Sequence, residues 1–382
     1  MTGVAVLGST GSIGRQALDV IGRLPDRFQV TGLAAGNASA EFQAQAARHA
    51  HARLWAASQR PEWASAAQWA DGGLVELATD SDVELVVVAT TGMSALPAVL
   101  AAIASGRTVA LANKETLVTG GHLVARALDD LGGDPLARLR PIDSEHSAIW
   151  QCLLGERMDD VERLVLTASG GPFRDRAAAD LGGVTPDEAL AHPTWRMGPK
   201  ITIDSATLVN KAFEVIEARW LYRLPYSRID AVIHPRSVVH SLVEFRDGSY
   251  KAQLGLPDMR LPIQYALTYP ERLPSPARSA APEAWGALEF QPLDASRFPA
   301  YAAVRAAASE GGNRGAVLNA ADEVAVAAFL AGSLPFPGIG ETIDAAIERW
   351  GTGAEPELDE LTAIDAEVRA ALTAELGMAE AP

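Results

Sequence analysis

A glycine-rich turn near the amino terminus constrains this chain most. Gly8, Gly11 and Gly14 follow the apolar run Val4–Leu7 and lead into a helical pattern, so a strand, a turn and a helix are expected in succession. Glycines let a backbone turn tightly against a pyrophosphate, and the N–H groups and positive dipole end of the helix attract phosphate charge. The turn therefore predicts dinucleotide binding, although its G-x-x-G-x-x-G spacing is not the commonest one.

Composition excludes several classes of function. With 382 residues the chain is long enough for two or three domains, and its 48% hydrophobic content is enough to form their cores. The formal net charge of −16 opposes broad binding to nucleic acid or anionic membranes, but a local basic pocket for a phosphorylated ligand is still allowed. The single cysteine, Cys152, forms no intrachain disulfide. With no signal-peptide pattern and no apolar run of about 20 residues, we expect a cytoplasmic protein with no nucleic-acid or membrane partner.

Short apolar runs alternate with helical stretches in the first third of the chain, which predicts a doubly wound, Rossmann-like α/β domain. The predicted strands are Val4–Leu7, Gln29–Ala35, Arg53–Ala57, Leu85–Ala89 and Thr108–Ala112. Ligands bind beyond the carboxyl ends of such strands. Asn113, Lys114 and Glu115 follow the last of these strands, so we expect them to face a cofactor crevice.

The pattern changes after about residue 145. A strand at Arg163–Thr167, a helix at Ser205–Tyr222 and a hairpin around Asp247-Gly248 predict a central α+β catalytic domain. Prolines then recur without periodicity, and the remaining chain has the helical spacing of a C-terminal bundle. The expected domains are 1–145 for the dinucleotide, 146–272 for catalysis with a flap around 192–199, 273–299 as a linker, and 300–382 as the helical domain.

Three carboxylates form a candidate metal site. Asp143 and Glu145 lie at a predicted strand-to-helix junction, where acidic residues also simply favour a helix start. Glu214 shares a predicted helix face with Asn210 and lies close to Lys211. The same spacing also fits a solvated Lys211–Glu214 pair that contributes little energy. If the carboxylates converge with open coordination positions, they suit Mg²⁺ or Mn²⁺ better than Zn²⁺. The residues alone leave both interpretations open.

Hydroxyl, amide and ammonium groups form a candidate phosphate site. Ser169 follows a predicted strand, and Ser205 opens the predicted helix that bears Asn210 and Lys211. Each of these residues is more often found in a turn or a cap when it occurs alone. Together they suit a phosphate group.

A long irregular stretch, His192–Pro199, lies between these elements. It contains two prolines and a glycine, and it carries the large apolar side chains of Trp195 and Met197. A buried tryptophan would explain the pattern, and so would a lid that excludes water from a polar site.

Ten ordered motifs spanning nearly the whole chain closely resemble the 1-deoxy-D-xylulose 5-phosphate reductoisomerase family. They are far more specific together than any one of them. The motifs are Gly8-Ser-Thr-Gly-Ser-Ile-Gly14, Ala112-Asn-Lys-Glu115, Asp143-Ser-Glu-His146, Ser169-Gly-Gly-Pro-Phe173, His192-Pro-x-Trp195, Asp204-Ser-Ala-Thr207, Asn210-Lys-x-x-Glu214, His234-Pro-x-Ser-Val-x-His240, Gly255-x-Pro257-Asp258-Met259-Arg260 and Leu318-Asn-Ala-Ala-x-Glu323.

The resemblance implies that a sugar phosphate, 1-deoxy-D-xylulose 5-phosphate, is rearranged and reduced with NADPH to 2-C-methyl-D-erythritol 4-phosphate in non-mevalonate isoprenoid synthesis. It implies that Asp143, Glu145 and Glu214 hold Mg²⁺ or Mn²⁺. The implied catalytic residues are Lys114, Asp143, Glu145, His192 and Glu214. The implied substrate contacts are Lys114, Ser144, Glu145, Ser169, His192, Ser205, Asn210, Lys211 and Glu214, of which Ser169, Ser205, Asn210 and Lys211 match phosphate-binding positions.

The same resemblance implies a cofactor site, a flap and a homodimer. The NADPH-contacting positions are Thr10, Gly11, Ser12, Ile13, Gly36, Asn113, Glu115 and Gly198. The flap residues are Trp195 and Met197. One departure affects cofactor choice. At Gly36-Asn37-Ala38-Ser39 the lysine and asparagine that similar enzymes often place near the 2′-phosphate are absent, and so is any acidic residue for a free ribose hydroxyl. We therefore expect a preference for NADPH with weakened or relocated phosphate contacts.

Two other functions compete with this assignment. An aspartate-semialdehyde dehydrogenase shares this glycine spacing but needs a nucleophilic cysteine, and Cys152 lies in an apolar helical stretch where an inert thiol is expected. A catalytically silent NADPH-binding regulator would keep the glycine turn but would have no need for the metal and phosphate residues. Their joint presence favours an enzyme.

Overall fold

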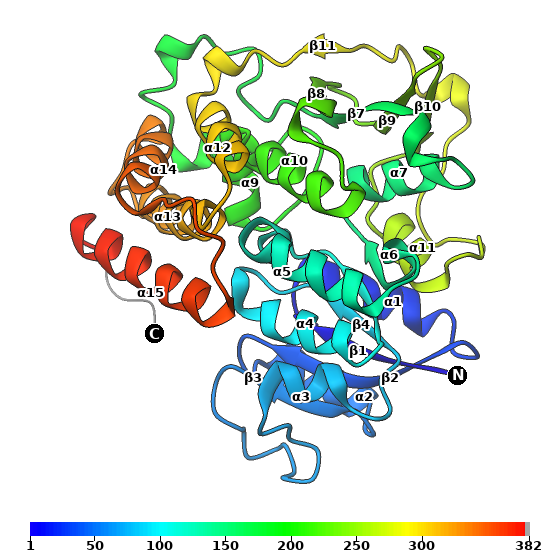
Figure 1. Cartoon of the computed structure of the whole chain (residues 1–382). Coiled ribbons are helices and arrows are strands. Elements are labelled where there is room, and N and C mark those ends of the chain that lie inside the picture. The colour runs from blue at the N-terminus through cyan, green and yellow to red at the C-terminus, as the bar shows by residue number, and fades with distance from the viewer. Residues whose placement is uncertain (379–382) are drawn as a thin grey trace. The chain divides into compact units, whose positions relative to one another are not determined.

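The structure is a computed structural model that describes residues 1–378. Packing divides the chain into two compact units (Figure 1). Unit 1 contains residues 1–116, 123–150 and 258–279, and unit 2 contains residues 117–122, 151–257 and the described part of 280–382. The predicted fold class, a Rossmann-like sheet followed by an α+β region and a helical bundle, is confirmed. The functional division at 145, 272 and 299 stays a prediction.

Unit 1 is built on a six-stranded parallel sheet with the order β3-β2-β1-β4-β5-β6. Its strands are β1 (Thr2–Leu7), β2 (Phe28–Ala35), β3 (Arg53–Ala56), β4 (Leu85–Val88), β5 (Thr108–Leu111) and β6 (Leu139–Pro141). The four residues of β4 are all buried. A strand covered on both faces reads as a mainly apolar run, which is why β1 to β5 were visible in the sequence, whereas no range was predicted for β6.

Helices cover both faces of this sheet. Right-handed crossovers place α1 and α2 on one face and α3 and α4 on the other, and α3 packs on α4 while α11 packs on α1. The helices are α1 (Ser12–Gly22), α2 (Ala40–Arg48), α3 (Gly73–Thr79), α4 (Leu96–Ala104), α5 (Glu115–Leu131), α6 (Pro135–Arg138), α7 (Ser144–Leu153) and α11 (Arg260–Thr268). From α11, Ile263, Ala266 and Leu267 enter the hydrophobic core of the sheet domain. Unit 1 therefore includes a segment from late in the sequence.

Unit 2 contains a mixed five-stranded sheet with the order β10-β9-β7-β8-β11. Its strands are β7 (Val161–Ala168), β8 (Ile229–Ile233), β9 (Val239–Phe245), β10 (Tyr250–Leu254) and β11 (Gln291–Pro292). β7 and β8 are parallel, whereas β9 and β10 form the predicted hairpin around Asp247-Gly248. The expected linker at 273–299 is largely exposed, but it adds β11 to the edge of this sheet.

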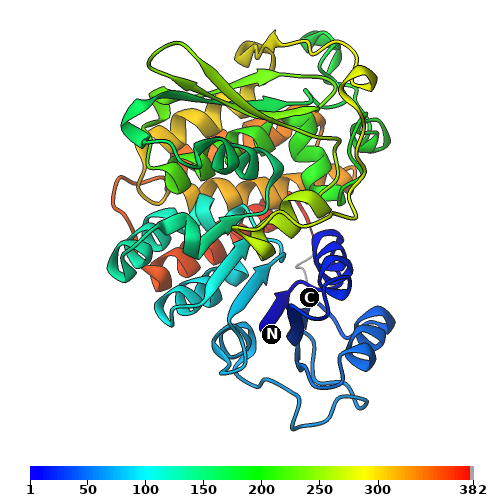
Figure 2. The same ribbon diagram turned by 90° about the vertical axis from the view of Figure 1, so that its right-hand side faces the viewer.

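Helices pack against this sheet and against one another. α10 contacts β7 and β8, and α12 packs on α10 (Figures 1 and 2). The helices are α8 (Pro186–Leu190), α9 (Pro199–Thr207), α10 (Val209–Tyr222), α12 (Pro299–Glu310), α13 (Arg314–Leu330), α14 (Phe336–Trp350) and α15 (Leu358–Glu375). Within residues 1–378, every helix is too short or too polar to span a bilayer.

The helix predicted at Ser205–Tyr222 is wrong in one respect. It is two helices, α9 and α10, which are separated by Leu208 in the left-handed conformation with φ of 61°. Ser205 therefore lies near the end of α9 instead of opening a helix. Apolar periodicity runs through both helices, so it does not reveal a break that is made by one residue's backbone.

Candidate active site

The Gly8–Gly14 turn joins β1 to α1 at the carboxyl edge of the parallel sheet. Gly8 has φ of +87°, and an added Cβ there would lie 2.4 Å from the Ala89 oxygen. A Cβ on Gly14 would lie 2.2 Å from the Gly8 oxygen, whereas on Gly11 it would be 3.3 Å from that oxygen. Gly8 and Gly14 are thus required by the backbone, and Gly11 is less constrained. No side chain in the described part of the chain caps α1, so its first turn presents backbone N–H groups.

A buried pair that the sequence did not single out supports this turn. Ser9 donates to Oε1 of Gln45 at 2.7 Å, and Nε2 of Gln45 donates to the Ser9 oxygen at 3.0 Å. Both residues are buried, and Gln45 belongs to α2. The turn is therefore fixed from outside its own sequence, through contacts that span 36 positions.

The segment Gly36–Ser39 follows β2 at the same edge. Ser39 caps α2 by accepting from the Phe42 amide, and the Ala38 amide donates to the Ser58 hydroxyl at 3.2 Å. The loop after β3 therefore lies against this segment, and it carries the exposed Arg60 two residues beyond Ser58. Arg60 is the nearest cation in sequence to this contact, and we did not predict it as a site residue.

Loops after β5 and β6 carry a second group of predicted residues. The Asn113 amide donates to the Thr90 and Gly92 oxygens and to Glu115, so its side chain ties neighbouring loops together. Lys114 forms an ion pair with Asp143. β5 and β6 are parallel neighbours. Their carboxyl ends therefore bring Lys114 and Asp143 together, as expected for residues at one edge of a sheet.

Asp143 organises the start of α7. Its Oδ1 accepts from the Glu145 amide at 3.2 Å and lies 3.5 Å from Nδ1 of His146, whose side chain is fully buried. Ser144 donates to the Glu145 carboxylate. His146 appeared in the sequence only as part of a motif, and its burial beside Asp143 makes it a positioning group that sequence reasoning missed.

In unit 2, the turn after β7 holds two predicted residues together. Nε2 of His192 lies 3.0 Å from the Ser169 hydroxyl. Nδ1 of His192 accepts from the Thr194 and Trp195 amides at 3.1 and 2.8 Å. Because a ring nitrogen that accepts two hydrogen bonds carries no proton, the other nitrogen, Nε2, is the one protonated, and it donates to Ser169.

Burial keeps His192 neutral. It lowers the pKa of His192 to about 4, and the positive charge of Arg174 acts in the same direction. At neutral pH the imidazole therefore offers one N–H donor at Nε2 and no positive charge.

The predicted polar residues of α10 lie in its first turns, directly after the break between α9 and α10. Lys211 donates to the Thr167 oxygen at 2.6 Å and forms an ion pair with Glu214, while the Asn210 amide donates to Glu214 at 2.6 Å. Lys211 and Glu214 are only 4% and 2% exposed. The interpretation as a solvated surface pair is therefore excluded, because buried charges of this kind are retained only with partners or for function.

Ser205 reaches the same region through a close backbone approach. A Cβ on Gly171 would lie 2.5 Å from the Ser205 oxygen, and Gly171 itself has φ of +66°. The turn after β7 therefore packs directly on α9. We refer to Ser169, His192, Ser205, Asn210, Lys211 and Glu214 as the α9–α10 cluster.

A buried ion-pair network braces α9 against α13. Lys200 on α9 lies 2.7 Å from Asp204 and 2.6 Å from Asp322, which is fully buried. Burial raises the pKa of Asp322, and the Lys200 charge opposes that shift. Lys200 and Asp322 were not predicted; only the motifs that contain Asp204 and Glu323 pointed to this region.

The flap stretch has no regular secondary structure between α8 and α9. The Trp195 ring lies 6.5 Å from that of His240, and both Trp195 and Met197 are half-buried. Gly198 caps α9 with open space around its Cα. In the same unit, burial raises the pKa of the Cys152 thiol to about 11, so this cysteine is protonated at neutral pH and is unsuited to nucleophilic catalysis.

Sequence comparison assigns the family. Models of 1-deoxy-D-xylulose 5-phosphate reductoisomerase match residues 4–121, and those of its C-terminal domains match 139–222 and 254–371. The 1-deoxy-D-xylulose 5-phosphate reductoisomerase of Pelotomaculum thermopropionicum is 50% identical over 379 residues, which cover 96% of both chains. This chain belongs to the 1-deoxy-D-xylulose 5-phosphate reductoisomerase family. The reductoisomerase of Geobacillus kaustophilus is 49% identical, with 96% of this chain and 97% of that protein covered.

Solved reductoisomerases share the fold. A crystal structure of DOX-P reductoisomerase in complex with NADPH, fosmidomycin and magnesium has a TM-score of 0.89 and 35% identity, and the match covers 99% of this chain and 98% of that one. The reductoisomerase from Zymomonas mobilis in complex with NADPH has a TM-score of 0.86 and 37% identity, with 98% and 99% covered. Reductoisomerases thus bind NADPH and magnesium on this architecture.

Proposed function

We propose that this chain converts 1-deoxy-D-xylulose 5-phosphate to 2-C-methyl-D-erythritol 4-phosphate in the non-mevalonate route to isoprenoid precursors, with NADPH as reductant and a divalent metal ion. The observation that carries the proposal is the burial of Lys211 and Glu214 at the start of α10, in a chain of this family. The chain first rearranges the carbon skeleton and then reduces the resulting aldehyde. Hydride goes from NADPH to the aldehyde carbon and a proton goes to its oxygen.

We propose that Asp143, Glu145 and Glu214 hold the metal. All three offer carboxylate oxygens, the donors that Mg²⁺ and Mn²⁺ prefer, so the residues fit the ion. The ion supplies Lewis-acid stabilisation of negative charge on substrate oxygens during the rearrangement. Lys114, as the ion-pair partner of Asp143, orients that carboxylate.

The α9–α10 cluster fits the two ends of a sugar phosphate. Ser169, Ser205, Asn210 and Lys211 offer hydroxyl, amide and ammonium groups near the start of α10, where the helix dipole favours an anion. Oδ1 of Asn210 is buried without a hydrogen-bond donor among the described residues, so it suits a substrate hydroxyl. His192 presents its Nε2 proton, and with Ser144 and Lys114 it is assigned to the reactive end.

NADPH is assigned to the carboxyl edge of the parallel sheet. Backbone groups of the first turn of α1 bind the pyrophosphate, as Rossmann turns do. The assigned contacts are Thr10, Gly11, Ser12, Ile13, Gly36, Asn113, Glu115 and Gly198. Because the Asn113 amide is engaged with three acceptors, we assign its contact with the cofactor to its backbone. Trp195 and Met197 form the flap that excludes water from the intermediate and the hydride.

The preference for NADPH rests on a relocated contact. Asn37 and Ala38 offer no cation, but Ser58 binds the Ala38 amide and brings the loop with Arg60 beside this segment. We propose that Arg60 supplies charge to the ribose 2′-phosphate. The domain boundaries at 145, 272 and 299, a homodimer and a cytoplasmic location complete the proposal.

The decisive experiment follows NADPH consumption with 1-deoxy-D-xylulose 5-phosphate, with and without Mg²⁺ or Mn²⁺, and identifies the product. Metal-dependent formation of the branched alcohol is expected. Absence of turnover in folded protein that binds NADPH would refute the assignment and favour a silent NADPH-binding regulator. An Asp143→Asn variant tests the site more narrowly, because it should weaken metal binding and leave NADPH affinity unchanged.

A further inference from the structure

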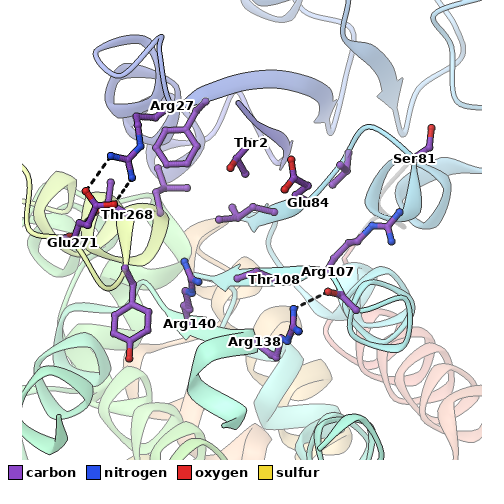
Figure 3. A pocket seen from close by; sticks show the side chains of 16 residues that line it. Thr2, Arg27, Ser81, Glu84, Arg107, Thr108, Arg138, Arg140, Thr268 and Glu271 are labelled. Atoms are coloured by element: carbon purple, nitrogen blue, oxygen red, sulfur yellow. Dashed lines mark hydrogen bonds and ion pairs between the residues drawn. The ribbon is translucent and has the colours of Figure 1, made fainter. Parts of the chain in front are cut away.

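A cavity of about 510 Å³ lies at the amino-terminal edge of the parallel sheet of unit 1 (Figure 3). It is lined by the first residues of four strands, Thr2 of β1, Phe28 of β2, Leu85 of β4 and Thr108 of β5, and by the loop after α11. The cofactor turn and Lys114 follow the opposite ends of these strands. A four-residue strand spans about 13 Å, so the cavity is separate from the proposed active site.

The cavity is positively charged in a protein whose formal net charge is −16. Four arginines line it, Arg27, Arg107, Arg138 and Arg140, against two glutamates. Arg27 is neutralised by Glu271, with contacts of 3.0 and 2.5 Å, as the dashed lines in Figure 3 show. The charges of the other three arginines therefore dominate the cavity.

Those three arginines are held by backbone oxygens. Arg107 donates to the Thr79, Asp80 and Ser105 oxygens, Arg138 to that of Gly106, and Arg140 to those of Ala137 and Ala266. Within residues 1–378 none of the three forms an ion pair with a carboxylate. Their positions are thus fixed while their charges are not neutralised.

Many of their donors are open. A guanidinium has five N–H groups, and the contacts above use three on Arg107, two on Arg140 and one on Arg138. Nε of Arg107 is buried with no acceptor among the described residues. Burial lowers the pKa of Arg140, and the like charge of Arg138 adds to that effect. An anion in the cavity would offset the repulsion between the like charges of Arg138 and Arg140.

The number of open donors selects the anion. Three guanidinium groups with two or more free N–H groups each exceed what one carboxylate can accept, whereas a diphosphate offers enough oxygens. The rest of the lining is mixed: hydroxyl groups of Thr2, Ser81, Thr108 and Thr268 lie beside apolar side chains that are almost fully buried. We propose that this cavity binds a small diphosphate-class anion.

Equilibrium binding of inorganic diphosphate to the full-length protein tests the proposal. Saturating NADPH and a chelator are included, because diphosphate competes for cofactor sites and binds divalent ions. The Arg107→Gln/Arg140→Gln variant should bind at least about tenfold more weakly than wild type, since each lost charge-assisted bond has an appreciable energy. The matched control is Arg23→Gln, at an exposed arginine that directly follows α1 and pairs with Asp19, and it should bind diphosphate normally.

A second variant guards against loss of folding. Ser81 lines the cavity and is exposed, so Ser81→Glu adds a negative charge without removing an arginine contact. It should weaken diphosphate binding severalfold while leaving thermal unfolding and NADPH affinity unchanged. Wild-type affinity in both the Ser81 variant and the double arginine variant would overturn the proposal.

A third variant separates this cavity from the catalytic phosphate site. Lys211→Met should leave diphosphate binding to the cavity intact, because Lys211 belongs to unit 2. Complete loss of diphosphate binding in a Lys211→Met protein that still binds NADPH normally would show that diphosphate occupies the catalytic cluster only, and it would overturn the proposal. None of these outcomes bears on the reductoisomerase assay.

Discussion

The Gly8–Gly14 turn and the α9–α10 cluster are both assigned to phosphate groups, but they are built differently. The turn offers backbone N–H groups. Its main requirement on side chains is that Gly8 and Gly14 have none, because a Cβ at either position would overlap backbone atoms. The cluster offers side chains, two of them buried charges that depend on each other. A backbone site should therefore respond to added volume, whereas a side-chain site should respond to a lost partner.

The largest expected effect comes from Lys211→Met. Removing the ammonium takes away the ion-pair partner of the buried Glu214 carboxylate, which keeps its hydrogen bond from Asn210, and breaking a buried ion pair typically costs about 3–5 kcal/mol. We expect kcat/KM to fall by about a thousandfold, measured by steady-state NADPH consumption. NADPH affinity, measured by fluorescence titration, should be unchanged. The control is Lys251→Met, which removes a half-exposed lysine and should retain full activity. Near-normal activity in the Lys211 variant would break the comparison.

Next in size is the pair Gly14→Ala and Gly11→Ala. A Cβ at Gly14 would overlap the Gly8 oxygen, whereas at Gly11 the nearest atom lies 3.3 Å away. Gly14→Ala should reduce NADPH affinity by tenfold or more and destabilise unit 1 by about 1–3 kcal/mol, as strain or overpacking does. Gly11→Ala should change both by less. Equal effects in titration and thermal unfolding would show that the turn is not limited by backbone clearance.

A smaller effect is expected from His192 as pH falls. Its pKa of about 4 in the folded protein lies below the ordinary value of about 6.5. The unfolded chain therefore binds more protons between these values, so the stability that His192 contributes is complete above pH ~6.5 and declines towards pH ~4. Because the side chain is partly exposed, we expect about 1 kcal/mol. Urea unfolding across this range should show a shallower dependence in His192→Gln. An identical dependence would contradict the neutral assignment.

The smallest expected effect concerns Arg60. An exposed cation contributes about 0.2–1 kcal/mol to an ionic contact. Arg60→Ala should thus raise KM for NADPH by about two- to fivefold and leave KM for NADH unchanged. Arg23→Ala serves as the control. An equal rise in KM for both cofactors would refute the proposed contact between Arg60 and the 2′-phosphate. Catalytic efficiency with NADH equal to that with NADPH would also refute it.

Local features of the fold could be predicted from the sequence, and features made by tertiary packing could not. The parallel strands β1 to β5 were visible because each contains a short run of mainly apolar residues, and β4 is apolar along its whole length. The burial of Lys211 and Glu214 was not visible, since their i,i+3 spacing is the same on a surface helix. The Ser9–Gln45 pair and the Lys200–Asp322 pair join positions 36 and 122 residues apart, and no local pattern encodes either. Ser205 was misplaced because one left-handed residue, Leu208, divides its helix.

The late arrival of α11 has a consequence for synthesis on the ribosome. All six strands of the unit 1 sheet have been made by residue 141, but Ile263, Ala266 and Leu267 of its core follow more than a hundred residues later. During synthesis, part of one face of this sheet therefore stays uncovered until α11 has been made, after strands β7 to β10 of the unit 2 sheet. A fragment that ends at residue 150 would keep every strand and yet expose apolar surface, so we expect it to aggregate, and adding residues 258–279 through a linker should restore its solubility.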